Sequence, residues 1–468
     1  HDGTNGGLID VSGITTIDPD VTVNLGGGFE SLSDLPGTVI LRSGTFSAGS
    51  TAPKSKLFTY ALSGTELTIA SEDFAEGIKE IISAASGGGV TDNYSNVGSL
   101  VNRLEHDDRV SRDLHGRLLS NLEKIDALAA KGGASETALK QFVGEEALTA
   151  INAQADTLIK VNTALNNRFQ AIHNFRQAPS AGYGAAANRF WVNGFGQWNR
   201  QKDTNRLKGY DYNLGGLVLG YDRETAAASG LTLGLNGAVT KGTLKNNDGL
   251  AETDVRAVNL GLYGTYEFGG GFFIDANLGY GYAENEAEIN LLTGGRKTGD
   301  FNSHSYQAGL NLGYAFNLGG TTRLTPSAGL QFTHIKQDGW REKIVADPDN
   351  DVVANWFDTS KHNFVEIPLN LKLDATFTTE SGISVAPELR VGGVIAANNH
   401  DSELRLGFVG ADDSTTIRGL SPAKSRFTAG AGLKVQLNET VDFFTGYDLE
   451  ARSGYQGHTA SLGLGFSF

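Results

Sequence analysis

The sequence contains no cysteine among its 468 residues. Disulfides, thiolate metal sites and a cysteine nucleophile are therefore excluded, and the redox compartment stays undetermined. Proline is scarce, with 9 residues against 62 glycines, which excludes a collagen-like repeat and is typical of closely packed strands joined by turns. Lys and Arg total 38 against 53 acidic residues, and this net charge of −15 argues against binding to nucleic acid.

Long apolar runs are missing as well. No stretch reaches the roughly 18 consecutive apolar residues that a transmembrane helix requires, and the N-terminus has no charged and then apolar signal segment. The chain begins with His1 rather than Met, so we expect a processed or trimmed piece of an exported protein. A β-barrel could still cross a membrane, because only alternate residues of its strands face lipid.

Residues 1–90 are rich in Gly, Ser, Thr and Asp, and they contain the apolar runs GGLIDV, DVTVNL, GTVILRSGTF and ELTIA. Turn residues separate these runs, so the pattern predicts short strands. We predict a β-rich passenger remnant over 1–90. Both a β-solenoid end, in which each rung buries its apolar face against its neighbours, and an irregular β cap are compatible with the spacing.

Helical periodicity follows. Between Asn93 and Ala129 apolar residues recur close to every 3.6 positions, which predicts an amphipathic helix within 91–134. After KGGAS, Ser135 can cap a second helix and Glu136 complements its dipole. A helix over 135–176 would be about 60 Å long, enough to cross a bilayer of about 40 to 45 Å. Its polar face suits a wet lumen, although a soluble coiled-coil stalk is the alternative.

From 189 to 468 the period changes from 3.6 to 2. In VNLGLYGTYEF, Val258, Leu260 and Leu262 alternate with Asn259 and Gly261, and YQAGLNLGYAFNL and VEIPLNLKLDATF show the same split. A soluble sandwich could alternate too. We predict about twelve strands, starting near Phe190, Tyr210, Leu231, Val255, Phe272, Ser305, Thr322, Asn363, Ile383, Arg426, Val441 and Gln456.

The connections between these strands alternate in length. Links such as GGG, TESG and NET are short, whereas those at 338–361 and 398–424 are long. This alternation is typical of an outer-membrane barrel with short periplasmic turns and long external loops. The predicted fold is therefore mainly β: a twelve-stranded antiparallel transmembrane β-barrel over 189–468, with the 135–176 helix in its lumen and a linker up to 188. Aromatic residues near strand ends predict interfacial girdles, at Phe190, Trp191, Trp198, Tyr210, Tyr221, Phe268, Phe272, Phe273, Trp340 and Phe468.

Charged residues on the polar parity of the strands are predicted to face the lumen, because a charge at the lipid midplane costs about 2 to 4 kcal/mol for Arg or Lys. The lumen-facing charges are Asp275, Glu366, Lys372, Asp374, Glu388 and Arg390. The residues of the pore helix expected to meet them are Leu158, Asn162, Leu165, Asn166, Asn167 and Phe169.

Three motifs together carry a family resemblance. RFWVNGFGQW opens the first strand, GLVLGYDRE lies in the second, and LGLGFSF ends the chain. With the helix before them, these motifs resemble the autotransporter β-domain family over about residues 135–468. The resemblance implies type V secretion, with an outer-membrane translocator whose lumen helix links a passenger at the cell surface to the first strand, so the 91–134 helix should lie outside. It also implies that the barrel assembly machinery recognises the chain end, at Phe468, Phe466, Leu464 and Leu462.

Some members of that family cut their passenger free inside the pore, between two Asn residues on the helix. Aligning LNNRF with the family's helix end places the bond nearer Thr163 and Ala164 than Asn166 and Asn167. We therefore predict that the Asn pair makes polar lumen contacts, and the sequence leaves cleavage itself open.

No catalytic constellation is present: the sequence has no GxSxG, HExxH or P-loop motif, so we predict no enzyme, cofactor or metal site. The segment between Asp347 and Asp358 overlaps an EF-hand spacing, but Val352 replaces the required Gly, and an acidic surface loop is the preferred interpretation. Besides the translocator, a diffusion porin and a barrel-anchored adhesin or structural surface protein remain open. The expected partners are outer-membrane lipid, the barrel assembly machinery, the chain's own passenger and, at the surface, further copies of the chain.

Overall fold

The computed structural model describes residues 9–15, 39–46, 58–63, 65–72, 76–77, 92–105, 107–130, 135–176, 188–203, 208–225, 230–398, 402–419 and 425–468. The predicted run DVTVNL lies outside these residues, as do parts of the predicted linker and long loops. None of the described helices has the length and apolar character needed to span a membrane.

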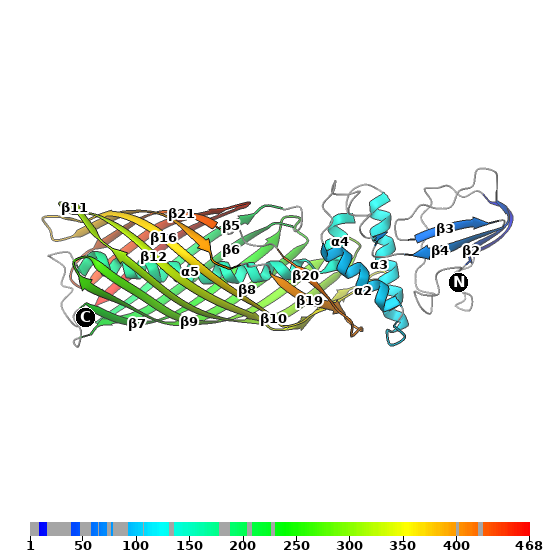
Figure 1. Cartoon of the computed structure of the whole chain (residues 1–468), viewed down its shortest axis with the longest axis horizontal. Coiled ribbons are helices and arrows are strands. Elements are labelled where there is room, and N and C mark those ends of the chain that lie inside the picture. The colour runs from blue at the N-terminus through cyan, green and yellow to red at the C-terminus, as the bar shows by residue number, and fades with distance from the viewer. Residues whose placement is uncertain are drawn as a thin grey trace.

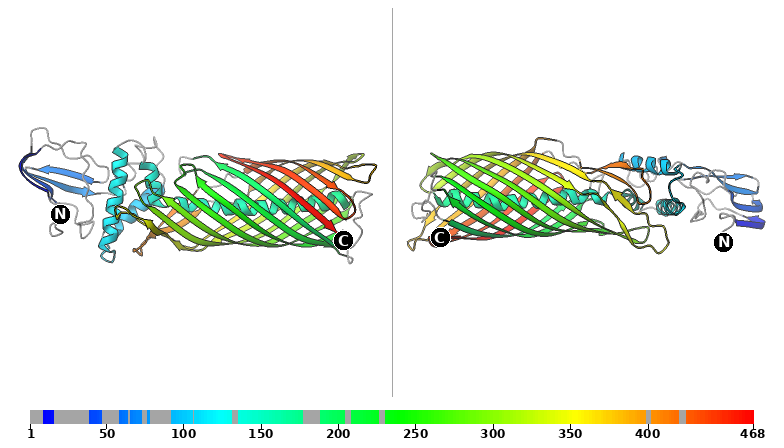
Figure 2. Two further views of the ribbon diagram at one scale, coloured as in Figure 1. Left: turned by 180° about the vertical axis from the view of Figure 1, so that it is seen from behind. Right: turned by 90° about the horizontal axis from the view of Figure 1, so that it is seen from below.

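Twelve antiparallel strands form a closed barrel, because each strand pairs with its neighbours and the ring closes where β23 meets β5 and β10 meets β12. Figures 1 and 2 show the strongly tilted strands of this barrel. The strands are β5 (Asn188–Gln201), β6 (Tyr210–Glu224), β7 (Leu231–Asn246), β8 (Ala251–Gly269), β9 (Phe272–Asn290), β10 (Arg296–Tyr314), β12 (Thr322–Gln337), β16 (Ser360–Ala375), β18 (Ser384–Ala396), β21 (Ser425–Gln436), β22 (Val441–Arg452) and β23 (Tyr455–Ser467).

The alternation in the sequence sets the two faces of the wall. Val258, Leu260 and Leu262 of β8 are 51, 68 and 62% exposed on the outside, whereas Asn259 points inward and is buried. The predicted twelve-stranded barrel is thus confirmed. Two strands are longer than predicted: β8 begins at Ala251 and β10 at Arg296, because their polar first halves still pair with neighbouring strands.

The aromatic girdle prediction was partly wrong. Trp191, Tyr210 and Phe273 point into the lumen, and Trp340 is buried between Phe301, on the inner face of β10, and Phe357. Neighbouring residues of a strand face opposite sides, so only one member of pairs such as Phe272 and Phe273 can face outward. Five residues of the predicted girdle are exposed on the outside, namely Phe190, Trp198, Phe268, Phe272 and Phe468.

The helices are more broken than predicted. The first helical stretch forms two helices, α2 (Asp92–Glu105) and α3 (Arg112–Ala130), separated by a turn in which Asp107 binds the backbone and guanidinium of Arg109. The second forms α4 (Ser135–Val143) and α5 (Glu146–Arg176). Gly144 between them has a φ of +74°, a conformation that ends an α-helix. Consequently only α5, about 46 Å long at 1.5 Å per residue, lies within the barrel (Figure 1).

The N-terminal strands are β1 (Ile9–Thr15), β2 (Val39–Phe46), β3 (Phe58–Ser63) and β4 (Glu66–Glu72). They form one sheet in the order β1-β2-β4-β3, in which only β1 and β2 are parallel. The described strands therefore do not stack as parallel solenoid rungs. Leu67 of this sheet packs into the same apolar cluster as α2, α3 and α4.

The described parts of the two long connections of the barrel form short strands. They contribute β13 (Trp340–Arg341), β15 (Asn355–Phe357), β19 (Glu403–Phe408) and β20 (Thr415–Arg418), which pair in that order into a small sheet. The short strands β11 (Phe316–Gly319), β14 (Lys343–Ala346) and β17 (Phe377–Thr378) extend the barrel edges. The small sheet and α2, α3 and α4 lie at one end of the barrel, here called the cap end (Figure 1). The other end, which carries the short links and the C-terminus, is called the turn end.

Candidate functional site

Helix α5 rests against one side of the lumen. Its residues Val161, Ala164, Leu165 and Phe169 recur at helical spacing and are all buried. They contact aromatic and aliphatic side chains on the inner face of β5 to β8, namely Trp191, Phe195, Tyr210, Tyr212, Leu214, Val218, Ala238, Leu244 and Tyr263. The helix is therefore packed against this wall rather than suspended in the pore.

A buried ion pair holds α5 against this wall. Arg168 of α5 and Asp222 of β6 are both fully buried, and the Arg168 guanidinium donates to both Asp222 oxygens, at 2.7 and 3.0 Å. Tyr263 donates to the same carboxylate at 2.8 Å, and the Trp191 indole N–H donates to Tyr263 at 2.7 Å. A Cβ at Gly220 would overlap the Trp191 ring, so this position in β6 needs glycine. This buried ion pair, which Arg189 also approaches at 3.7 Å from Asp222, thus joins the helix to the wall.

A second contact holds the helix near the turn end. The His173 ring lies 2.8 Å from Glu267 and 2.9 Å from Asp275 through its two nitrogens, and it packs on Phe273 at 4.2 Å. Arg323 donates to the His173 carbonyl oxygen and pairs with Asp374 at 2.6 Å. The last turns of α5 are therefore joined to β8, β9 and β12.

The predicted lumen-facing charges lie on the opposite wall and mostly pair with one another. Lys372 contacts Asp374 at 3.0 Å, and Glu388 binds both Arg390 and Lys434. Glu366 pairs with Arg426 at 2.5 Å, and Asp275 binds His173. The structure thus places all six predicted residues on the inner face, and Asp275 contacts α5 through His173.

A cavity of about 210 Å³ separates α5 from this charged wall. Asn166, Asn167 and Phe169 of the helix line it, and Lys372 and Arg390 face them. The predicted lumen position of the Asn pair is thus observed, whereas Ala164, nearer the aligned scissile bond, is buried against the other wall. Leu158 closes the gap toward the cap end by packing on Ile335 and Phe364. The backbone of Asn162 belongs to α5, and its side chain lies outside the described residues.

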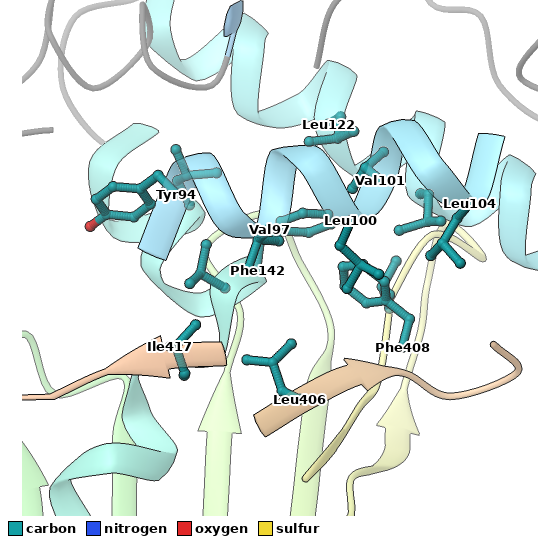
Figure 3. Packing of buried hydrophobic residues seen from close by; sticks show 14 of the residues in the cluster. Tyr94, Val97, Leu100, Val101, Leu104, Leu122, Phe142, Leu406, Phe408 and Ile417 are labelled. Carbon is teal, nitrogen blue, oxygen red and sulfur yellow. The ribbon is translucent and has the colours of Figure 1, made fainter. Parts of the chain in front are cut away.

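The cap end is covered by a large apolar core. Val97, Leu100, Val101 and Leu104 of α2 are fully buried together with Leu122 of α3 and Phe142 of α4. The small sheet of the barrel connections supplies Leu406, Phe408 and Ile417, and Figure 3 shows these side chains directed at α2. We call this unit, formed by residues 92–148 with 340–357 and 402–418, the cap.

Polar contacts join the same partners. Asn93 of α2 donates to the Arg418 carbonyl at 2.8 Å and accepts from its amide at 2.7 Å, as a neighbouring strand would. Gln141 of α4 makes a similar reciprocal pair with the backbone of Asn290 and Leu292, at 2.8 Å each. The helices therefore satisfy backbone groups of the β18–β21 and β9–β10 connections.

The acidic segment between Asp347 and Asp358 docks on α3. Arg117 pairs with Asp347, and Lys124 contacts Asp349 at 2.7 Å and Asp351 at 2.5 Å. Partial burial alone would raise the pKa of Asp347, but the Val352 amide and the Arg117 guanidinium outweigh burial and lower that pKa. Asp347, Asp349 and Asp351 of the predicted acidic surface loop are thus paired with cations of α3.

A lumen closed by a helix of the same chain, in a twelve-stranded barrel, is the arrangement that the sequence resemblance implied. The model of the autotransporter β-domain family matches residues 190–448, more than half of the chain. The chain belongs to the autotransporter β-domain family. This autotransporter barrel is accordingly an outer-membrane translocator domain.

Relatives and solved structures agree with this assignment. Outer membrane protein A of Rickettsia rickettsii is 23% identical over 99% of this chain and 21% of its own length. Outer membrane protein B of Rickettsia japonica is 21% identical over 73% of this chain and 22% of its length. The translocator domain of the autotransporter NalP from Neisseria meningitidis shares the fold, with a TM-score of 0.51 and 15% identity over 67% of this chain and 98% of that one. The chain spans about a fifth of the length of these two Rickettsia proteins.

Sequence reasoning missed Arg168, His173 and Asp222, the residues that hold the autotransporter helix in its barrel. Arg168 lies three residues after Leu165 and four before Ile172, within the apolar stripe of α5. A charge in a buried stripe requires a buried partner. A search for such a partner among the residues of β6 that face the lumen would have pointed to Asp222.

The substitution Asp222→Asn should loosen the helix. It leaves the Arg168 charge buried without its counter-ion, and breaking such a pair typically costs about 3 to 5 kcal/mol. We expect frequent transient openings in single-channel recordings of the purified chain in planar bilayers. The matched control is Asp211→Asn on the outer face of the same strand, where the side chain is exposed.

Restoring neutrality offers a second check. The double variant Asp222→Asn with Arg168→Gln should return the recordings part of the way toward the closed state, because the Arg168 charge is removed and only Arg189, 3.7 Å from Asp222, loses that ion pair. Openings that are as rare in Asp222→Asn as in the unmodified chain would show that this pair does not hold the helix.

Proposed function

We propose that this translocator displays its N-terminal region, residues 9–148 of the described chain, on the cell surface and keeps it anchored there, acting as a conduit and a support rather than as a catalyst. One observation carries the proposal: α5 runs through the lumen and connects the cap at one end to the first strand at the other. A chain in this arrangement has segments on both sides of the membrane that the barrel crosses.

The direction of display follows from the two barrel ends. The first and last strands begin and finish together at the turn end, where Asn188 and Phe468 exchange backbone hydrogen bonds at 3.1 and 2.9 Å. Outer-membrane barrels keep both chain ends and their short turns in the periplasm. The cap end, with the long connections, would then face the outside.

Alternate side chains at the chain end support the expected recognition by the barrel assembly machinery. Leu462, Leu464, Phe466 and Phe468 are 56, 38, 38 and 73% exposed on the outer face of β23. An apolar row on the outer face of the final strand would be accessible to the barrel assembly machinery. Its function as a signal remains a proposal, as does self-association of the displayed region.

The position of α5 inside the lumen argues against a diffusion porin. The helix fills one side of the lumen, and the cap with its apolar core covers the outer end. Small solutes would need a path past both. The cavity beside the helix narrows at Leu158, Ile335 and Phe364, which pack together.

Labelling of single cysteines tests the display directly, because the chain has none of its own. Ser63→Cys in the exposed end of β3 should react with a membrane-impermeant maleimide in intact cells. Ser381→Cys, in the exposed turn between β17 and β18, is the matched control and should react only after the outer membrane is permeabilised. Labelling of Ser381→Cys but not Ser63→Cys in intact cells would reverse the proposed orientation.

A further inference from the structure

The outer face of the barrel carries cations at the edge of its apolar belt nearest the cap. On each of five strands the first charged or titratable side chain next to the belt is basic or an imidazole. Lys241 follows Val239 on β7, Arg256 precedes Val258 on β8, and His304 precedes Tyr306 on β10. On β12, His334 and Lys336 follow Phe332, and on β16 Lys361 lies beyond Val365. On the remaining strand of this group, β9, the position is taken by Glu284.

Two pairs of these cations lie directly opposite each other on neighbouring strands. Lys241 is the register partner of Arg256, and Lys336 is the register partner of Lys361. Directly opposed residues of an antiparallel pair have Cβ atoms about 4.5 to 5.5 Å apart, and like charges in such a pair are destabilising. His304 lies on the other side of Lys336 and extends that row across a third strand.

Nearby acidic residues compensate these charges only in part. Lys336 contacts Asp338 at 2.6 Å, and His304 lies 3.5 Å from the same carboxylate. Arg256 is the register partner of Glu284 on its other side and lies 3.7 Å from Glu286. Within the described residues, Lys241 and Lys361 have no acidic group within ion-pair distance. Elsewhere on the same outer face cations oppose acids: Lys245 pairs with Glu252 at 2.9 Å and Lys343 with Asp300 at 2.8 Å. The opposed cation pairs are thus a departure from the local pattern.

The two edges of the belt also differ. At the turn end, the outward-facing strand residues that the structure describes carry a single cation, Arg223. At the cap end the cations lie at the level where the outward side chains change from Tyr280 and Tyr306 to charged residues. That level corresponds to the headgroup region, since aromatic belts mark the membrane interface.

We propose that the pairs Lys241–Arg256 and Lys336–Lys361, the latter with His304, bind phosphate groups of a phosphorylated lipid in the outer leaflet. A phosphate between two opposed cations would remove their repulsion and accept hydrogen bonds from both. The inference rests on the proposed function for its orientation, in which the cap end faces the outside. The lipid of the surrounding membrane is the chosen source of the phosphate, because the cations adjoin the apolar belt and its acyl chains.

The test uses the purified full chain in detergent, titrated with lipid A, with lipid A stripped of its phosphates, and with inorganic phosphate. Native mass spectrometry counts bound lipid, and thermal unfolding reports stabilisation. We expect retention of phosphorylated lipid A and a rise in Tm with it alone. Replacement of Lys241, Arg256, Lys336 and Lys361 by Gln should weaken binding by about fivefold per cation, since each is worth about 1 kcal/mol beside an anionic lipid surface.

The matched control replaces Lys245 and Lys343, two outward cations that each face an acid, by Gln, and lipid A should still bind. Equal retention of the dephosphorylated lipid, or unchanged binding by the fourfold variant, would overturn the proposal. A Tm rise produced equally by inorganic phosphate would also overturn it, by assigning the site to a free ion. Surface labelling of Ser63→Cys on the fourfold variant separates this outcome from a failure of display.

Discussion

A barrel that begins at residue 177 should conduct ions at least about tenfold better than one that begins at Ser135, because the shorter chain lacks a rod about 10 to 12 Å in diameter. Both truncations remove α2 and α3, so α4 and α5 are the difference between them. The packing of α5 on β5 to β8 and the Arg168–Asp222 pair are lost in the shorter chain. Single-channel conductance in planar bilayers measures the effect.

Folding must be verified for both truncations before their conductances are compared. Heat-dependent gel mobility in detergent distinguishes a closed barrel from an unfolded chain. Two folded barrels with the same high conductance would show that α5 does not obstruct the lumen, and the porin interpretation would then regain support.

Replacement of Phe408 in the cap by alanine is expected to make local opening of the cap helices more frequent. Phe408 is fully buried among α2, α3 and α4, with its ring 5.3 Å from that of Phe142. Phe408→Ala should cost about 3 to 5 kcal/mol, the usual range for such a cavity-forming change. Amide exchange across 92–143 should accelerate by at least about a hundredfold, because each 1.4 kcal/mol is a factor of ten when exchange follows local opening.

The barrel itself should be unaffected by Phe408→Ala, and its amides provide an internal reference. Phe268→Ala, which removes an outward ring that is 62% exposed, is the matched control and should leave exchange in the cap unchanged. If exchange in α2 and α3 were as slow in Phe408→Ala as in the unmodified chain, the helices would have to be held by contacts other than the shared core.

The barrel was predictable because its rule is local. Every second residue of a strand faces lipid. The outward direction of Val258 and Leu260 could therefore be predicted without knowing which strand pairs with theirs. The same rule placed Asp275 and Lys372 inside. Helix α5 was predictable for a related reason, since its stripe repeats every 3.6 residues. Its start was misplaced because Gly144, within a favourable helical pattern, adopts a left-handed conformation.

The cap was not predictable, because its contacts join residues far apart in the sequence. Asn93 and Arg418 are 325 positions apart, and Arg117 and Asp347 are 230 apart. Neither hydrophobic periodicity nor loop length predicts which of these distant residues pair. The connections at 338–361 and 398–424 were therefore predicted only as long external loops, and the sequence did not show that Leu406 and Phe408 in the second are fully buried. Apolar residues in a supposedly exposed loop were the one available signal.

The composition of the cap also sets an order of events. Its core needs α2 and α4 from before the barrel together with β15 and β19 from between barrel strands. In the proposed display, this core is complete only when the helices have reached the cap end and the strands that flank β15 and β19 are in place. Contacts of such long sequence separation form late, because their loop-closure entropy must be overcome first. In the proposed display, the burial of the cap core would be gained at completion, and it would have to be given up before the chain could slip back.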